Sequence, residues 1–491
     1  MTTMQQHPYI KKIVFVLFFT FCSFVFSINS PSHPWNSSNT CVDSTAFQTI
    51  AMLIKKGYFP YKDTFDHKGP LLYIINYIGY SVNAIWGIWL IECFFLTATL
   101  LFMFKISKLV CNNLLALIST FFASMLLFKY YDFGNLTEEY AMIFISISLY
   151  IFLDYFLNNY LTNFRLIICG SCFAFVFLLR VNMVALWFIF CLSIFVICIY
   201  QKKYTELLKY ISLFILGATI VTIPVLMWLS FNNSLLEFFN CYILFNLTYS
   251  TSSKIGILVI FMYAVFSFTP QMIISVSTCI YQYTKVKSNI YIIFALYLLF
   301  SLLTISLPGR NYMHYGMINI PATIFPISIF INLIFNEFKI LNNLLHIILT
   351  IFIIVFLFSP LKQTSSAYLT RHENKYPQGV TSTCNVIESN SNENDKISVY
   401  GNWDMIYLLT NRLPASKYSY QFPIGTVSPK IFDEYFNDLE KTQPILIIIE
   451  PERFDKNIEN FLQKNNYNCI ADIPYENSKD NILIYKKMTI K

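Results

Sequence analysis

Long apolar segments recur along most of this chain, and they constrain its fold more than any other feature. A segment of about 20 apolar residues is long enough to cross the hydrocarbon layer of a membrane as a helix. Only 12% of the residues are charged, whereas soluble chains carry about 25%. The sequence therefore predicts a multi-spanning membrane protein with eleven spans, near residues 12–29, 82–104, 113–129, 140–157, 166–181, 183–200, 208–230, 256–280, 289–306, 316–335 and 343–360.

The basic residues of the short loops predict how the chain is oriented. Cytoplasmic loops of membrane proteins are enriched in Lys and Arg. Placing the N-terminus in the cytoplasm puts ten of these residues inside, namely Lys11, Lys12, Lys105, Lys108, Arg165, Lys202, Lys203, Lys285, Lys287 and Lys339. Eleven spans then place the C-terminal region outside a bacterial inner or plasma membrane. The net charge of +7 is explained by this loop bias, so no nucleic-acid partner is expected.

The N-terminal apolar segment has two interpretations. Residues 12–29 have the length of a signal-peptide core, but Ser27-Ile28-Asn29-Ser30-Pro31 makes a poor cleavage site. A retained anchor is therefore favoured.

The C-terminal part of the chain has a different character. Residues 363–491 are more polar, and they contain strand-like segments at Ile397–Tyr400, Ile445–Ile449 and Ile482–Tyr485 with a helix expected from Trp403. Strands that alternate with helices predict a small α/β domain. The expected organisation is a transmembrane domain over 1–362, with a long outer loop at 30–81, followed by an extracytoplasmic α/β domain over 363–491.

Reactive side chains gather in the loops that this topology places outside. The first outer loop carries most of them, and membrane proteins seldom keep such charges near their spans without a function. Convergence at one membrane face predicts a site for a charged amphiphile. The candidates are Asp43, Tyr61, Asp63, Asp66, His67 and Lys68 in the first loop, Glu138 and Glu139 in the second, Arg180 in the third, Asn246 and Tyr249 in the fourth, and Arg310, Tyr312 and His314 in the fifth.

These residue types fit transfer of a sugar from a polyprenyl phosphate. A carboxylate removes the proton from an acceptor hydroxyl as it attacks the anomeric carbon, and Asp43 is the first candidate, with Asp63 and Glu138 as alternatives. Cations hold the phosphate as it leaves. Candidates for donor and phosphate binding are Lys68, Arg310, His314, Tyr312 and Arg180, and candidates for acceptor binding or loop positioning are Asp66, His67, Glu139 and Tyr61.

Each of these residues also has a structural interpretation. Asp43 stands where an acid favours the start of a helix, and the Thr137-Glu138-Glu139 run is typical of a helix N-terminus. Lys68 and Arg310 are placed where long cationic side chains reach from a helix end to the interface. The sequence contains no Gly-rich phosphate loop and no Cys/His zinc spacing. No cofactor or metal ligand is therefore predicted, and metal dependence stays open.

The order of these elements resembles that of the GT-C superfamily, and in particular bacterial proteins similar to protein O-mannosyltransferases and aminoarabinose transferases. The resemblance rests on an early loop Asp, a Tyr-x-Asp-x-x-x-x-Lys-x-Pro-Leu element at 61–71, the Thr137-Glu138-Glu139-Tyr140 run and the segment Gly309–Tyr315. It implies that the first-loop acid is catalytic and that the donor is a polyprenyl-phosphate sugar. Ser44 stands where many members have a second acid, so the resemblance leaves the identity of the base open.

The favoured function is a GT-C-type, inverting glycosyltransferase that acts on the outer face. Its partners would be a polyprenyl-phosphate-linked sugar, membrane lipids and a cell-envelope acceptor that is a lipid, a polysaccharide or a protein. A transporter or flippase of lipid-linked glycans is an alternative, although it would place ionisable residues near the middle of the membrane. A glycan polymerase or ligase is the other alternative, but its large outer loop usually comes late in the chain.

Overall fold

The protein divides into two compact units. The computed structural model describes residues 8–35, 41–251, 258–259, 261–262, 269–310, 312–337, 342–373 and 376–488. The helical unit comprises Met1–Ser30, Trp89–Met227 and Ser253–Tyr368, and the α/β unit comprises Pro31–Ile88, Trp228–Ser252 and Leu369–Lys491. The domain boundary expected between 362 and 363 stays a prediction, and the structure groups most of the first outer loop with the C-terminal region.

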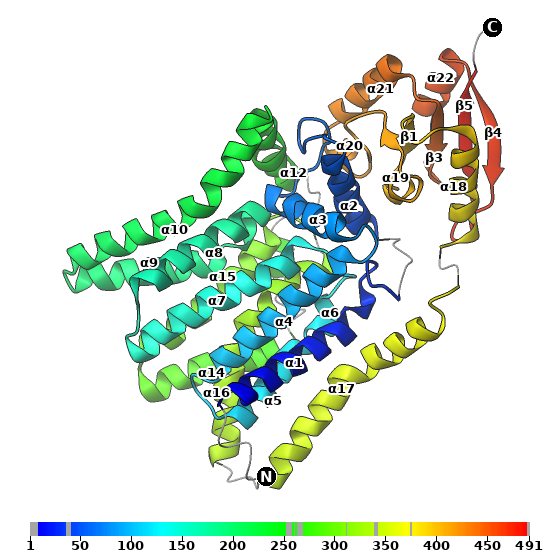
Figure 1. The fold of residues 1–491 in the computed structure, drawn as a ribbon. Coiled ribbons are helices and arrows are strands. Elements are labelled where there is room, and N and C mark those ends of the chain that lie inside the picture. The colour runs from blue at the N-terminus through cyan, green and yellow to red at the C-terminus, as the bar shows by residue number, and fades with distance from the viewer. Residues whose placement is uncertain are drawn as a thin grey trace. The chain divides into compact units, whose positions relative to one another are not determined.

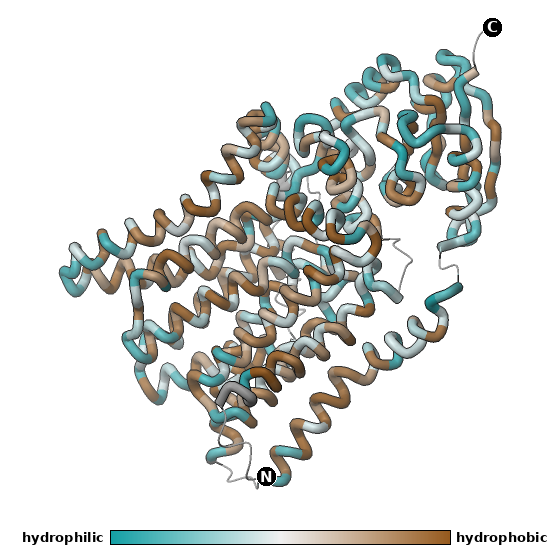
Figure 2. Tube along the Cα trace, viewed as in Figure 1, coloured by the Kyte–Doolittle hydropathy of each residue, from teal (hydrophilic) through white to brown (hydrophobic). Residues whose placement is uncertain are grey.

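Long apolar helices make up the helical unit (Figures 1 and 2). Among the described residues, eight helical stretches are long and apolar enough to cross a membrane, and two shorter apolar helices accompany them. The helices and short 3-10 segments are α1 (Pro8–Phe26), η1 (Ser27–Asn29), α4 (Gly87–Ser107), α5 (Asn113–Ser124), α6 (Leu127–Tyr130), α7 (Thr137–Asn158), α8 (Asn163–Leu179), η2 (Val181–Met183), α9 (Ala185–Tyr200), α10 (Tyr204–Phe231), α14 (Pro270–Val286), α15 (Asn289–Ser306), η4 (Met313–Ile318), α16 (Asn319–Glu337) and α17 (Asn342–Leu369).

These helices match the predicted spans closely. The expected span at 289–306 coincides with α15, and the short pair at 166–181 and 183–200 corresponds to α8 and α9. The span expected at 256–280 lies partly outside the described residues, and its described part belongs to α14, which runs on to Val286. The protein is a multi-pass membrane protein.

Side-chain caps begin several of these helices. The first backbone N–H groups of a helix lack intrahelical partners, and Ser, Thr, Asp or Asn side chains accept hydrogen bonds from them. Asn112 accepts from Leu115 N at the start of α5, and Thr162 accepts from Arg165 N at the start of α8. Thr269 accepts from Met272 N before α14, where Pro270 occupies the first helical position. Local sequence therefore sets where these helices begin.

Two glycines allow α8 and α10 to approach backbone to backbone. A side chain on Gly170 would clash with the carbonyl of Phe214, and one on Gly217 would clash with the carbonyl of Ile167. The Ser171 hydroxyl also donates to the Gly217 carbonyl over 2.9 Å. Small residues at such crossings are the usual means by which membrane helices pack closely.

The α/β unit contains one mixed sheet and the helices of the first loop. Among the described residues the sheet has five strands in the order β2-β1-β3-β5-β4, with β1 parallel to β2 and β3 and with β5 antiparallel to β3 and β4. Its elements are α2 (Val42–Lys55), α3 (Pro70–Val82), α11 (Leu235–Phe238), the π-helix η3 (Phe239–Leu244), α12 (Phe245–Thr251), α18 (Gln378–Asn390), β1 (Lys396–Tyr400), α19 (Met405–Thr410), β2 (Leu413–Pro414), α20 (Ile424–Val427), α21 (Lys430–Thr442), β3 (Leu446–Ile449), α22 (Lys456–Lys464), β4 (Tyr467–Ile473) and β5 (Ile482–Lys487).

The first loop contributes to both cores of this unit. Alternate residues of β3 face opposite sides of the sheet, so that Leu446 and Ile448 lie in one core while Ile447 and Ile449 lie in the other. Ala46 and Phe65 of the first loop join the core of Ile447, and Met52 and Leu53 of α2 join the core of Leu446. The predicted C-terminal α/β domain is therefore confirmed, and the segment 42–65 is built into it.

Candidate active site

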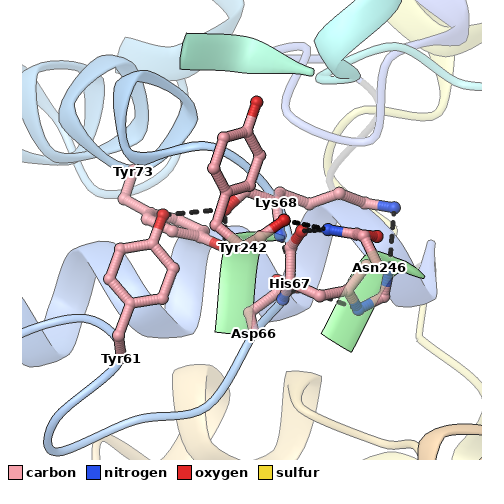
Figure 3. Close-up of polar contacts among 7 residues, drawn as sticks. All are labelled: Tyr61, Asp66, His67, Lys68, Tyr73, Tyr242 and Asn246. Carbon is pink, nitrogen blue, oxygen red and sulfur yellow. Dashed lines mark hydrogen bonds and ion pairs between the residues drawn. The ribbon is translucent and has the colours of Figure 1, made fainter. Parts of the chain in front are cut away.

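The turn that carries the polar motif of the first loop is closed by its own side chains (Figure 3). We call Tyr61–Lys68 the first-loop turn. The buried Tyr61 hydroxyl donates to the Lys68 carbonyl over 2.7 Å, and Tyr73 of α3 donates to the same oxygen over 3.2 Å. Pro70 begins α3 directly afterwards, because its fixed φ suits the first helical position. These contacts fix the turn, and the assignment of Tyr61 to acceptor binding or loop positioning stays a prediction.

Asp63 uses its carboxylate inside this segment. Its Oδ2 accepts a hydrogen bond from Phe59 N over 2.8 Å, and its own N–H donates to the Phe59 carbonyl over 2.9 Å. Such reciprocal bonds fix a turn. The geometry favours a structural role for Asp63, whose catalytic assignment stays a prediction.

His67 is held by aromatic and amide contacts from α12. Its ring stacks on Tyr249 with centroids 5.3 Å apart, and its carbonyl accepts from Asn246 Nδ2 over 2.7 Å. Lys68 Nζ lies 3.5 Å from His67 Nε2 (Figure 3). The fourth-loop residues singled out in the sequence therefore contact the first-loop turn within the same unit.

Asp66 is the buried acid of the first-loop turn. Its Oδ1 accepts from His67 N over 2.5 Å and from Lys68 N over 3.3 Å. Burial raises the pKa of Asp66 to about 6, the Lys68 charge opposes that rise, and the Asp43 charge adds to it. The sequence predicted Asp66 as an acceptor-binding or loop-positioning residue, and that assignment stays a prediction. Its other oxygen, Oδ2, has no hydrogen-bond partner among the described residues.

Asp43 lies in the first turn of α2, where an acid complements the positive end of the helix. Asp43 is only partly buried, whereas the residues that follow it in α2, from Ser44 to Leu53, are buried. Tyr420 lies close enough to three acids to feel their charges. Burial raises the pKa of Tyr420, and the charges of Asp66, Asp404 and Asp43 raise it further. The structure therefore brings Asp43 and Asp66 into one electrostatic environment.

Asp404 was not among the residues predicted from the sequence. It follows β1, begins α19 and is fully buried. Burial raises its pKa to about 7; Ser419 opposes that rise, and the charges of Asp66 and Glu450 add to it. The one available signal was its position directly after a predicted strand, where functional residues of α/β domains often lie. We call Asp43, Asp66 and Asp404 the acid cluster.

The predicted residues of the second, third and fifth loops lie in the helical unit. Glu138 forms an ion pair with Arg180, whose guanidinium lies 3.9 Å from the Tyr315 ring centroid. Both charged side chains are mostly buried. This pairing neutralises the Arg180 charge within the fold, which weighs against a free phosphate-binding role for it.

His314 has a carboxylate partner that the sequence did not suggest. Its Nδ1 lies 3.2 Å from Asp132 Oδ2, and Tyr312 stacks on its ring with centroids 5.6 Å apart. The hydrogen bond from His314 lowers the pKa of Asp132. Arg310 precedes these residues and is partly buried. The assignment of Arg310, Tyr312 and His314 to a donor phosphate stays a prediction.

Glu139 takes part in an unexpected pair of buried carboxyl groups. Asn135 N lies 2.8 Å from Glu139 Oε2 and 2.6 Å from Glu92 Oε1, and Ser30 donates to the other Glu92 oxygen over 2.6 Å. These contacts fix the loop before α7. Among the described residues, no group of three or more His, Cys, Asp or Glu has a metal-binding arrangement.

Comparison with known proteins places the chain in a family. The family described as putative competence-induced protein Ccs4 N-terminal domain matches residues 2–335. The chain belongs to this family. Among curated proteins, none matches it.

Solved structures share the fold of this Ccs4-family chain. ArnT from Cupriavidus metallidurans bound to undecaprenyl phosphate has 11% identity and a TM-score of 0.61, with 99% of each chain covered. The apo state of the same ArnT has 10% identity and a TM-score of 0.58, covering 90% of this chain and 92% of that one. The apo oligosaccharyltransferase of Archaeoglobus fulgidus has 12% identity and a TM-score of 0.52, covering 98% of this chain and 75% of that one. The predicted GT-C-type fold with a small C-terminal α/β domain is confirmed.

Proposed function

We propose that this Ccs4-family protein is a membrane glycosyltransferase that moves a sugar from a polyprenyl phosphate to a cell-envelope acceptor on the outer face of the membrane. The observation that carries the proposal is the likeness over nearly the whole chain to ArnT bound to undecaprenyl phosphate. The first-loop acids of the α/β unit support it, because they supply the type of group that the reaction needs.

Asp43 is the proposed general base. Its partial exposure leaves it accessible to an acceptor, and an ionised carboxylate within reach of a hydroxyl takes up its proton as the oxygen attacks the anomeric carbon. Direct attack of the acceptor with departure of the lipid phosphate would invert the anomeric centre. Burial raises the pKa of Asp66 to about 6, so Asp66 is protonated more readily than an exposed aspartic acid. Asp43 is less buried than Asp66, so it is the better placed of the two to meet an acceptor.

Lys68 is the proposed phosphate-binding cation of the first-loop turn. Its backbone carbonyl is fixed by Tyr61 and Tyr73, while its side chain lies beside the His67 ring. A cation held on a rigid turn stabilises the negative charge that develops on a leaving phosphate without having to reorganise. His67 and Asn246 then act as supports of this cation.

The transporter alternative receives little support from the placement of the buried acids in the helical unit. Glu92 lies in the second turn of α4, Glu139 in the first turn of α7, and Asp154 near the end of α7. Asp154 is paired with Arg165 over 2.5 Å. A transport pathway would place ionisable groups near the middle of the spans.

Replacing Asp43 tests the proposed function. Asp43→Asn is expected to lower sugar transfer by about 10²-fold or more, because general-base catalysis contributes on that order. The readout is mass spectrometry of lipid extracts from a strain that lacks the gene and carries either the wild-type or the variant copy. A polyprenyl-phosphate sugar should accumulate without the gene, disappear with the wild type and persist with Asp43→Asn.

The matched control is Asp433→Asn. Asp433 is an exposed acid in the first turn of α21, so its replacement removes the same charge from the first turn of another helix. It should restore transfer fully. Transfer by Asp43→Asn at the control level would remove Asp43 from the chemistry, and the absence of any accumulating lipid would contradict the proposed function itself.

A further inference from the structure

Asp404 presents an energetic problem that the fold alone does not solve. Its side chain is fully buried; among the described residues the Ser419 hydroxyl interacts with its carboxyl group, but neither oxygen has a partner at good hydrogen-bond geometry. Burying a carboxyl group without partners costs several kcal/mol, so such residues persist where they serve a function. A neutral residue of similar size would fill the same space at lower cost.

A second unpartnered carboxyl oxygen belongs to the same cluster. Asp66 Oδ2 is buried and has no partner among the described residues, while Asp66 Oδ1 is occupied by the N–H groups of His67 and Lys68. The charge of Asp66 acts on Asp404, and both charges act on Tyr420. Three carboxyl oxygens that lack a well-formed hydrogen bond among the described residues therefore belong to one electrostatically coupled cluster in the α/β unit.

The sheet topology places Asp404 where α/β domains commonly bind ligands. β1 lies between β2 and β3 and is parallel to both, so the chain leaves β1 toward β2 on one side and then crosses to β3 on the other. Ligands of open α/β sheets bind outside the carboxyl ends of the strands at such a reversal. Gly401, Asn402 and Asp404 follow the carboxyl end of β1, and Glu450 follows that of β3.

The first loop is tied to this strand end. Thr49 of α2 donates its hydroxyl to the Asp404 carbonyl over 3.2 Å, and Phe65 N donates to the Lys417 carbonyl over 2.8 Å. These bonds fix the Asp404 backbone against α2, the helix whose first turn carries Asp43, and they do not use the side-chain oxygens of Asp404.

We propose that Asp404 and Asp66 form a subsite that accepts hydrogen bonds from the hydroxyl groups of a sugar. This inference rests on the proposed function and assigns a substrate-binding role to the C-terminal domain. These carboxyl oxygens accept hydrogen bonds, and sugar hydroxyls are neutral donors that can meet several acceptors at once. The nearby charge of Lys68 already compensates Asp66, which makes a cationic ligand unnecessary. The sugar belongs either to the donor lipid or to the acceptor, and the experiment below separates these two sources.

The first measurement combines stability with transfer. Asp404→Asn keeps the size of the side chain but removes a buried charge, so it should raise the midpoint of thermal unfolding of the purified protein while it abolishes at least nine-tenths of the transfer in cells. Functional residues show this trade of stability against activity, whereas structural ones do not. Asp455→Ala is the contrast in stability, because Asp455 caps α22 by accepting from Asn457 N and Ile458 N, and an Ala side chain cannot accept these bonds, so its replacement should lower the midpoint.

The pH dependence gives the sign of the stability effect. The pKa of Asp404 is raised in the folded protein, so its ionisation destabilises the fold increasingly as the pH rises from about 4 to about 7. The groups that interact with it are Asp66 on the first-loop turn, Glu450 after β3, Ser419, Tyr420 and Tyr407 of α19. The gain in midpoint from Asp404→Asn should therefore be larger at pH 8 than at pH 5.

Donor binding separates the two sources of the sugar. The polyprenyl-phosphate sugar isolated from the strain without the gene is titrated into purified wild-type protein and Asp404→Asn, and binding is followed by tryptophan fluorescence. A loss of affinity of tenfold or more assigns the subsite to the donor sugar. Unchanged donor affinity together with lost transfer assigns it to a sugar of the acceptor.

Other outcomes would overturn the inference. Transfer by Asp404→Asn within twofold of the wild type would show that no substrate depends on this carboxyl group, and a lower midpoint at pH 8 would show that Asp404 is structural. If Asp404→Asn does not fold, Asp404→Ser, which keeps a small hydrogen-bond acceptor, is put to the same two criteria. If the wild-type gene consumes no accumulated lipid, the proposed function fails, which is distinguishable from a failure of this subsite alone.

Discussion

At the residue scale, Asp132 illustrates how one contact links charge to stability. Its Oδ2 accepts from His314 Nδ1, and that hydrogen bond lowers the pKa of Asp132. A carboxyl group whose pKa is lowered by folding stabilises the folded state above its unfolded pKa of about 4 and loses that contribution as the pH falls through the folded pKa. The Asp132 side chain is nearly half exposed, so water and salt weaken the effect.

Asp132→Asn is therefore expected to destabilise the protein slightly and in a pH-dependent way. The loss should be about 0.2–1 kcal/mol at pH 7, in the range of partly exposed ion pairs. It should shrink as the pH falls below 4, because the wild-type carboxylate is then protonated too. Thermal unfolding in detergent at several pH values measures this, and a loss that does not vary with pH would rule out the charge of Asp132 as its cause.

At the element scale, the crossing of α8 and α10 depends on the absence of side chains. Gly170 and Gly217 each face a backbone carbonyl of the opposite helix, so the helices pack more closely than any larger residue would allow. Lipid tails offer no hydrophobic drive for helix association, and close van der Waals packing must supply it instead.

Gly217→Val is expected to separate these helices and to lower the unfolding midpoint by several degrees. The new side chain would meet the Ile167 carbonyl, and overpacking of this kind costs about 1–3 kcal/mol. Ile220→Val is the matched control, since Ile220 lies one turn away on α10 and is 55% exposed. Equal midpoints for the two variants would show that α8 and α10 do not pack at Gly217.

The elements that could be predicted from the sequence are those with a local signal. The spans were predictable because a continuous apolar run of about 20 residues identifies a span by its own composition, whatever it packs against. The strands β1, β3 and β5 were predictable from short runs rich in β-branched residues. The strand β2 is two residues long, and β4 carries several exposed residues, so neither has such a run. The π-helix η3 likewise follows from packing rather than from composition.

The candidate site was predictable only in part, for the same reason. Asp43 and the first-loop turn stand out because charges beside apolar spans are rare. Asp404 is one acid among many in a polar domain, and its contact with Thr49, 355 positions earlier, exists only in the folded chain. Asp132 was missed because only the folded chain brings it next to His314.

At the scale of the whole molecule, the loop charges predict that the C-terminal domain lies outside the cell. The chain offers a natural probe, because Cys469 on β4 is an exposed free thiol. An impermeant thiol reagent should therefore label wild-type protein in intact cells, and Cys469→Ser should remove most of that label.

A cytoplasmic position supplies the control for this orientation. Ser288 precedes α15 at the end predicted to face inward, so Ser288→Cys in the Cys469→Ser background should be labelled only after the membrane is permeabilised. Labelling in the opposite pattern would mean that the number of spans or the N-terminal orientation is wrong, with the short α8 and α9 pair as the first place to look.

The contribution of the first loop to both cores of the C-terminal sheet has a consequence for biosynthesis. Ala46, Met52 and Leu53 emerge early from the ribosome, but the strands that bury them are made roughly 350 residues later. At about 5–20 residues per second this interval lasts on the order of 20–70 seconds. During that time the apolar face of α2 stays uncovered, so the acid cluster is assembled only when the strands of the sheet have been made. A ribosome that stalls late would release a chain with all of its spans and no assembled acid cluster.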